Sequence, residues 1–131
     1  MRDGQVHPVG QGNNAFIFPG LGFGAILAEC CEITDDMVLE AAYALADYTA
    51  AAHMQSGRIY PPVRELREVS IRVGARVIEL ALRDGVAGKT DLSERDLDTY
   101  LRSRSWKPRY LPIVRGDHTA MIDHPGYQKT D

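Results

Sequence analysis

Asn13 and Asn14 are the residues whose chemistry best suits binding of a small polar ligand. Each side-chain amide offers one carbonyl acceptor and two N–H donors, which together fit a carboxylate, a hydroxyl or a carboxamide. An amide neither takes nor gives a proton at neutral pH, so the pair would orient a ligand rather than carry out acid–base chemistry. The same pair also fits an ordinary asparagine-rich turn, and spacing alone favours that turn.

Two glycine patterns near this pair match G-x-G-x-x-G/A, the phosphate-binding loop of dinucleotide-binding folds. That loop needs a strand before it, a helix after it and an acidic residue at the end of a second strand about 20 residues on. The segment at that distance, Thr34–Asp36, has the composition of a helix start instead. We therefore interpret the glycines as sites of close helix packing; the two patterns are Gly10, Gly12 and Ala15, and Gly20, Gly22 and Ala25.

The remaining reactive side chains form no complete catalytic or metal-binding set. The histidines lack metal-ligand spacing and are expected at the surface; they are His7, His53, His118 and His124. Cys30 and Cys31 are adjacent, which excludes a disulfide framework, and buried structural thiols are the commoner case. Arginines between residues 63 and 84 are offset by glutamates, which indicates a solvated or interface face rather than a phosphate cradle.

The elements that position these residues are expected to be mostly α-helical. A short strand is expected at Gly4–Val9, then a buried, glycine-rich helix that begins at Pro19 and runs to Ala28. A second helix begins after Thr34, its N-cap, and runs to about Ala52. Its apolar positions recur at helical spacing, at Val38, Ala41, Ala42, Leu45, Tyr48 and Ala52.

A third helix, Val63–Asp84, has the clearest helical pattern, and Gly85 is placed to end it. It carries one apolar stripe of Leu66, Val69, Val73, Val77 and Leu80, and i,i+4 pairs Arg64–Glu68, Glu68–Arg72 and Glu79–Arg83. A fourth helix is expected from Ser93, with Leu97, Tyr100 and Leu101 inward. Prolines and glycines beyond Trp106 indicate that residues 111–131 form a surface arm or flexible tail.

Length and charge limit the class of protein. The chain of 131 residues has room for one domain, and its 44% hydrophobic and 25% charged residues are ordinary for a globular protein. The net charge of −3 argues against a nucleic-acid binder, and no apolar run is long enough to span a membrane. Cysteine usage favours a reducing compartment, so we expect a cytoplasmic location.

Three segments resemble the malic enzyme family. The stretch from Gly10 to Gly22, GQGNNAFIFPGLG, is similar to the family's GQ-x-NN-x-x-x-(F/Y)PG segment. Residues 57–62, GRIYPP, are similar to its GRLYPP segment, and residues 106–110, WKPRY, resemble its closing W-x-P-x-Y. Order and approximate spacing agree over residues 10–110.

The resemblance implies the C-terminal portion of a Rossmann-type α/β enzyme, with residues 1–110 as the end of an NAD(P)-binding domain and its C-terminal helices. Malic enzymes oxidise malate with NAD or NADP and decarboxylate the product to pyruvate and CO₂, using Mg²⁺ or Mn²⁺. Carried over, Asn14 would hydrogen-bond a malate oxygen, and Asn13 would hold the nicotinamide end or the loop. Gly12 would let the backbone approach the cofactor closely.

The resemblance also implies that the general acid and base, the metal ligands and the Rossmann loop lie outside these residues. We then expect a chain that is inactive alone. Its glycine-rich helix and helices two and three would expose apolar surface, which favours the remainder of the enzyme or a second copy in a homo-oligomer as the partner. A malolactic enzyme segment and a stand-alone, non-catalytic helical interaction module are the alternatives. The preference between NAD and NADP stays open.

Overall fold

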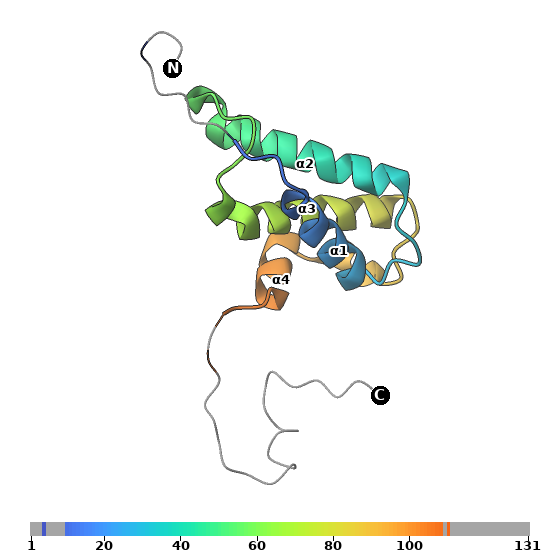
Figure 1. Cartoon of the computed structure of the whole chain (residues 1–131). Helices are drawn as coiled ribbons and strands as arrows, with labels where there is room; N and C mark the ends of the chain where they lie inside the picture. Colours follow the sequence, from blue (N-terminus) through green and yellow to red (C-terminus); the bar gives the residue numbers. More distant parts are fainter. Residues whose placement is uncertain (1–3, 5–9, 109, 111–131) are drawn as a thin grey trace.

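In the computed structural model, the described residues are 4, 10–108 and 110, and they are mainly helical (Figure 1). The longer helices are α1 (Phe18–Leu27), α2 (Asp35–His53), α3 (Leu66–Arg83) and α4 (Leu97–Arg104). Short 3₁₀ turns lie between them: η1 (Asn14–Phe16), η2 (Met54–Ser56), η3 (Val63–Glu65) and η4 (Thr90–Glu94). The expectation of a mostly helical segment with four helices is confirmed.

Extended pairing within the described ranges is limited to one isolated antiparallel bridge, between Cys30 and Ala87. The strand expected at Gly4–Val9 lies outside the described residues except for Gly4, and so does the arm expected at residues 111–131. Both therefore stay predictions.

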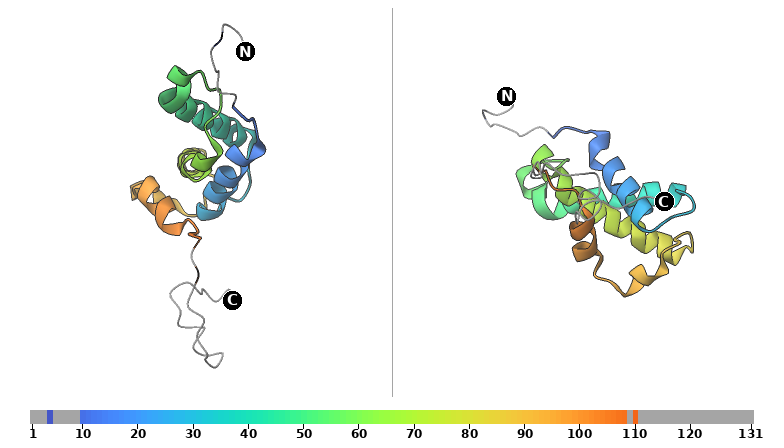
Figure 2. Two further views of the ribbon diagram at one scale, coloured as in Figure 1. Left: turned by 60° about the vertical axis from the view of Figure 1, so that its left-hand side comes forward. Right: turned by 90° about the horizontal axis from the view of Figure 1, so that it is seen from below.

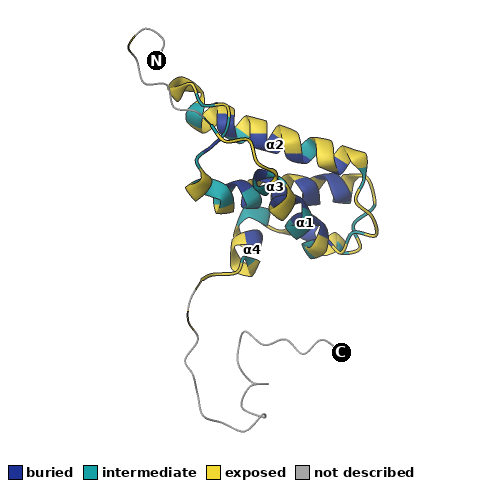
Figure 3. Ribbon diagram, in the orientation of Figure 1, coloured by how far each residue is buried: buried dark blue, intermediate teal, exposed yellow. Residues whose placement is uncertain are grey.

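Helix α3 is the centre of the packing. Figure 2, left, shows it nearly end-on, with α2, α1 and α4 arranged around it. The expected stripe is confirmed: Val69, Val73 and Val77 are fully buried, in one cluster with residues of α1 and α2. A second buried stripe, unforeseen, packs Ile71 and Ile78 against the region of α4. Figure 3 accordingly shows α3 as the helix most completely buried.

The glycines of α1 allow its close approach to α3. A Cβ on Gly24 would lie 2.7 Å from the carbonyl oxygen of Gly74, and one on Gly20 would lie 2.6 Å from the Cβ of Val73. A Cβ on Gly22, by contrast, would meet nothing within 4 Å. Close helix packing, the expected role of this glycine pattern, is confirmed for Gly20 and does not apply to Gly22.

Helix α2 begins as expected, but the set of residues that it buries differs from the predicted one. The Thr34 hydroxyl accepts a hydrogen bond from the Met37 amide at 3.2 Å, which confirms the N-cap. The buried residues are Met37, Ala41, Ala44, Leu45 and Thr49, whereas Val38, Ala42 and Ala52 are exposed, so the expected stripe was partly wrong. The shift is possible because Thr49, a polar residue, satisfies its hydroxyl within the helix by donating to the Leu45 carbonyl at 2.8 Å.

Helix α4 begins four residues later than expected. The Asp96 side chain accepts a hydrogen bond from the Asp98 amide at 3.2 Å and caps the helix at Leu97, so the start predicted at Ser93 is wrong. Arg95, with ψ of 150°, is extended and separates the 3₁₀ turn η4 from α4. Tyr100 and Leu101 are buried as expected, and Gly85, with φ of +73°, follows the end of α3 as predicted.

Three arginines of α3 bind carboxylates, in part across helices: Arg72, Arg76 and Arg83. Arg76 donates to Glu40 of α2 at 2.6 Å, and Arg102 of α4 donates to Glu68 of α3 at 2.6 Å. Within α3, the predicted Glu68–Arg72 pair is present at 3.7 Å. Arg64 and Arg83 instead contact their sequence neighbours Glu65 and Asp84.

Candidate functional site

The asparagine pair lies where an extended segment enters α1. Asn13 has extended backbone angles and caps η1: its Oδ1 accepts a hydrogen bond from the Ala15 amide at 2.9 Å. Asn14 is the first residue of that turn, and both side chains are exposed. Asn13 therefore orders the loop through its side-chain oxygen, and the N–H groups of its exposed side chain stay available to a ligand.

All three residues predicted to bind ligands line the same hollow. Gly12, Asn13 and Asn14 form one wall of an open depression of about 670 Å³. The remaining lining is apolar apart from one hydroxyl and comes from α1, α2 and the loop before α3: Ile17, Phe18, Val38, Leu45 and Tyr60. A mostly apolar lining with a few polar groups is typical of sites that bind a small ligand.

Tyr60 contacts the loop and joins two distant segments of the chain. Its ring stacks on Phe16 with centroids 6.1 Å apart and planes at 24°. A Cβ on Gly12 would lie 3.1 Å from Cε2 of Tyr60, and one on Gly10 would lie 3.1 Å from the Tyr60 amide nitrogen. Glycine at both positions therefore allows the loop to lie against Tyr60. Sequence reasoning noted Tyr60 only as part of a motif and missed this contact.

A polar cluster lies at the end of α2, next to the Tyr60 loop. Glu65 Oε2 accepts a hydrogen bond from the Tyr48 hydroxyl at 3.0 Å and lies 2.7 Å from His53 Nε2. The hydrogen bond with His53 holds the pKa of the Glu65 carboxyl below its usual value, whereas burial and then the Glu65 contact raise the pKa of Tyr48 to about 12.

His53 is not the surface residue that was expected. Its side chain is 15% exposed and bound to Glu65. The other histidines, at positions 7, 118 and 124, lie outside the described residues.

The cysteines are free and differ in exposure. Cys30 is half-buried, and this burial, followed by the charge of Cys31, raises the pKa of its thiol. Cys31 is exposed, so the expectation of buried structural thiols is wrong for Cys31. Among the residues described, no three His, Cys, Asp or Glu side chains gather as metal ligands would. Within the same ranges, none of the helices is both long and apolar enough to cross a bilayer.

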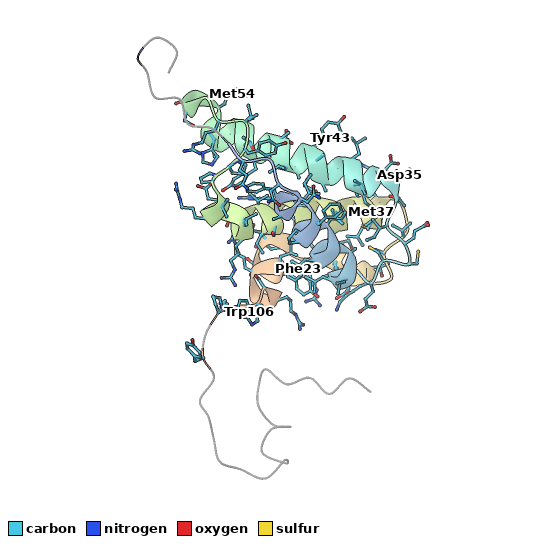
Figure 4. All side chains as sticks on the ribbon, in the orientation of Figure 1. Phe23, Asp35, Met37, Tyr43, Met54 and Trp106 are labelled. Carbon is cyan, nitrogen blue, oxygen red and sulfur yellow. The ribbon has the colours of Figure 1, made fainter. Side chains whose placement is uncertain are left out.

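Apolar surface is exposed on α1 and α2, two of the three helices where it was expected, whereas among the described residues no exposed large apolar side chain lies on α3. The facing sides of α1, α2 and α3 bury one another. The exposed apolar residues of α2 include Leu39, at 51%, and Tyr43, at 55%, on the side away from α3. Figure 4 shows Tyr43 directed outward from this helix, with Met54 at its end. Among residues of α1, Phe18 and Ile26 are exposed, so the expectation holds in part for the glycine-rich helix.

Comparison with known proteins shows where this segment belongs. A family model described as "Malic enzyme, NAD binding domain" matches residues 1–82. The chain is 38% identical over 108 residues to the NADP-dependent malic enzyme of Dictyostelium discoideum. This match covers 82% of this chain and 19% of that protein. It is 35% identical over 123 residues to NAD-dependent malic enzyme 2, mitochondrial, of Arabidopsis thaliana, with coverage of 87% and 20%.

The human relative gives the same result. The NADP-dependent malic enzyme, mitochondrial, of Homo sapiens is 33% identical over 119 residues, covering 91% of this chain and 20% of that protein. The chain thus spans about a fifth of the length of the curated relatives it matches. The resemblance carried by the three sequence motifs is confirmed: the chain belongs to the malic enzyme family, as a segment of its NAD-binding domain.

Proposed function

We propose that this segment supplies the asparagine wall of the malate and nicotinamide site in an NAD(P)-dependent malic enzyme, which converts malate to pyruvate and CO₂. The observation that supports this most is the placement of Gly12, Asn13 and Asn14 together on one open hollow, with Tyr60 packed against Gly12 and Phe16 of the same loop. Family membership supplies the reaction class, and the hollow supplies a place for the ligand.

Each of the three residues has a distinct part in the proposal. Asn14 donates a hydrogen bond to a malate oxygen and thereby fixes the orientation of the substrate. Asn13 already uses its Oδ1 on the Ala15 amide, so its N–H donors are the groups that would meet the nicotinamide carboxamide. Gly12 lies on the same hollow, so its backbone would border the cofactor, while its missing Cβ leaves room for the Tyr60 ring.

The proposal assigns positioning, and not proton transfer, to this segment. NAD or NADP, when bound, accepts the hydride from malate. Mg²⁺ or Mn²⁺, the general acid and the general base would be held by the remainder of the enzyme. Amide side chains cannot exchange protons at neutral pH, so the segment contributes orientation of the reacting groups.

The apolar outer face of α2 supports the view that this segment acts within a larger protein. Leu39 and Tyr43 lie on it with Ala42, Ala46 and Ala50, all exposed. We propose that the remainder of the enzyme, or a second copy in an oligomer, covers this face. The chain alone should then show no malate oxidation and should self-associate in size-exclusion chromatography with light scattering. A monodisperse, folded monomer would contradict the proposal that this face needs a cover.

The first test is the mass of the protein that contains these residues in its source cells, read by intact mass spectrometry. A species several times heavier than 14.5 kDa supports a segment of a complete malic enzyme. A species of that mass would favour the stand-alone binding module instead. Because relatives include proteins named as mitochondrial and chloroplastic, fractionation of the cells also tests the predicted cytoplasmic location.

The site itself is tested by Asn14→Ala in the enzyme, with Gln11→Ala as the control on the same loop. A hydrogen bond to a charged ligand contributes roughly 1.5–3 kcal/mol, so kcat/KM for malate should fall roughly 10- to 150-fold. Gln11 is exposed and is not part of the hollow, so its variant should keep normal kinetics. Unchanged kinetics for Asn14→Ala would refute the assignment, and measuring pyruvate against lactate separates malic from malolactic activity.

A further inference from the structure

Residues 54–64 form a loop whose two ends are joined by side chains. His53 closes α2, Glu65 ends the 3₁₀ turn that precedes α3, and their side chains meet at 2.7 Å. Tyr48, on α2, donates to the same Glu65 oxygen at 3.0 Å. Glu65 therefore binds two side chains of α2 at once and pins the loop at its base.

The pinned loop carries the residue that supports the asparagine wall. Tyr60 lies within it, followed by the fully buried Pro61. The Tyr60 ring stacks on Phe16 and lies against Gly12. The backbone of residues 61–64 thus links Glu65 to Tyr60, and the contacts of Tyr60 with Phe16 and Gly12 reach the loop that holds Asn13 and Asn14.

We propose that Glu65 is a positioning residue for the asparagine wall, acting through the loop of residues 54–64 and Tyr60. Compact loops keep their shape when their ends are held together, because an open base restores the conformational freedom that closure removes. Loss of the Glu65 contacts should then loosen Tyr60 first and the asparagine loop next.

The charges around this cluster come from α3 and from the turn that precedes it. Arg64 approaches Glu65 to 3.8 Å from the preceding position. On α3, the charge of Glu68 raises the pKa of Tyr48 and the charge of Arg72 lowers it. Glu65 is the member that contacts both α2 side chains, which makes it the residue to change.

Three variants of the full chain separate positioning from general stability. Glu65→Ala removes both contacts. Glu65→Gln keeps an oxygen for the Tyr48 hydroxyl and should rescue part of the effect. Tyr48→Phe removes one hydrogen bond and nothing else, which keeps the test valid if Glu65→Ala fails to fold. Glu68→Ala is the matched control, because Glu68 also pairs with arginines but lies outside the cluster.

Hydrogen–deuterium exchange read by mass spectrometry tests the proposal independently of catalysis. Glu65→Ala should speed exchange by about tenfold in peptides of residues 10–18 and 54–62 and leave the α3 core, residues 70–82, unchanged. The effect should be smaller for Glu65→Gln and Tyr48→Phe and absent for Glu68→Ala. No change at residues 10–18, or equal acceleration in the α3 core, would overturn the proposal.

The kinetic consequence rests on the proposed function and is read separately in the enzyme. Glu65→Ala should raise KM for malate several-fold and change kcat less, because the asparagine wall binds substrate and does not transfer protons. Faster exchange at residues 10–18 with normal kinetics for both Glu65→Ala and Asn14→Ala would leave the positioning role intact and refute the proposed site. Impaired Asn14→Ala kinetics with unaltered exchange in Glu65→Ala would support the proposed site and refute the positioning role of Glu65.

Discussion

Gly24→Ala tests the packing on which the whole arrangement depends, the contact between α1 and α3. The added methyl group would lie 2.7 Å from the carbonyl oxygen of Gly74, 3.0 Å from the Gly74 Cα and 3.1 Å from the Cβ of Val77. Two of these three neighbours are backbone atoms of a buried helix, which no side-chain rotation can move. The two helices must therefore separate, and the site suffers too, because α1 directly follows the asparagine loop.

The expected magnitude follows from two opposing effects. Forcing an extra methyl group into a packed core costs typically about 1–3 kcal/mol, and a backbone contact favours the upper part of that range. Alanine in place of glycine inside a helix contributes about 1 kcal/mol in the other direction. We expect Gly24→Ala to destabilise the chain by about 1–2 kcal/mol in net.

Gly22→Ala is the matched control on the same helix. A Cβ at this position would meet nothing within 4 Å, so only the gain in helix propensity applies. It should stabilise the chain by about 0.5–1 kcal/mol. Urea unfolding followed by circular dichroism measures the free energy of unfolding of both variants. In a thermal melt, each kcal/mol of stability should shift the melting temperature by roughly 3–6 °C. Gly24→Ala as stable as Gly22→Ala would refute the close approach of α1 to α3.

Three further changes test the elements around the site. Thr34→Ala removes the cap of α2 and should cost about 1 kcal/mol, measured by urea unfolding. Met37→Ala empties a fully buried position and should cost about 2–5 kcal/mol by the same measurement, whereas Met54→Ala, at an exposed position, should stay within about 0.5 kcal/mol. The pKa of Glu65 is lowered in the folded chain, mainly by the hydrogen bond with His53. Its ionised form therefore stabilises the fold above its usual pKa, and this contribution is lost as pH falls through the lower, folded value. Glu65→Gln should be less stable than the parent chain at pH 7, and the difference should shrink as pH falls below about 4.5; a gap that widens in acid would contradict this sign.

Several elements of this fold could be predicted because their signals are local. Thr34 caps α2 through the amide three residues on, and Gly85 ends α3 by a positive φ that its own lack of a side chain permits. The stripe from Val69 to Leu80 depends only on helical periodicity. The family, too, could be recognised from short motifs, because each is contiguous in the chain.

Local signals predicted the wrong helix start, or the wrong buried face of a helix, where the sequence offers two candidates. Leu92 is buried next to Ser93, yet Asp96 offers a better cap, so α4 begins at Leu97. On α2, Val38 is apolar and exposed, whereas Thr49 is polar and buried, because a hydroxyl that bonds within its own helix does not need water. The second buried face of α3, with Ile71 and Ile78, exists only because α3 is central.

The chemistry of Asn13 and Asn14 follows from the sequence, since the donors and acceptors of an amide belong to the side chain whatever surrounds it. The contacts that hold them in place depend on the packing of the whole chain. Tyr60 is far from Gly12 in the chain, and Glu65 meets His53 and Tyr48 across a loop. Such contacts arise when helices pack and bring distant segments together, and no periodicity or spacing within one segment encodes them.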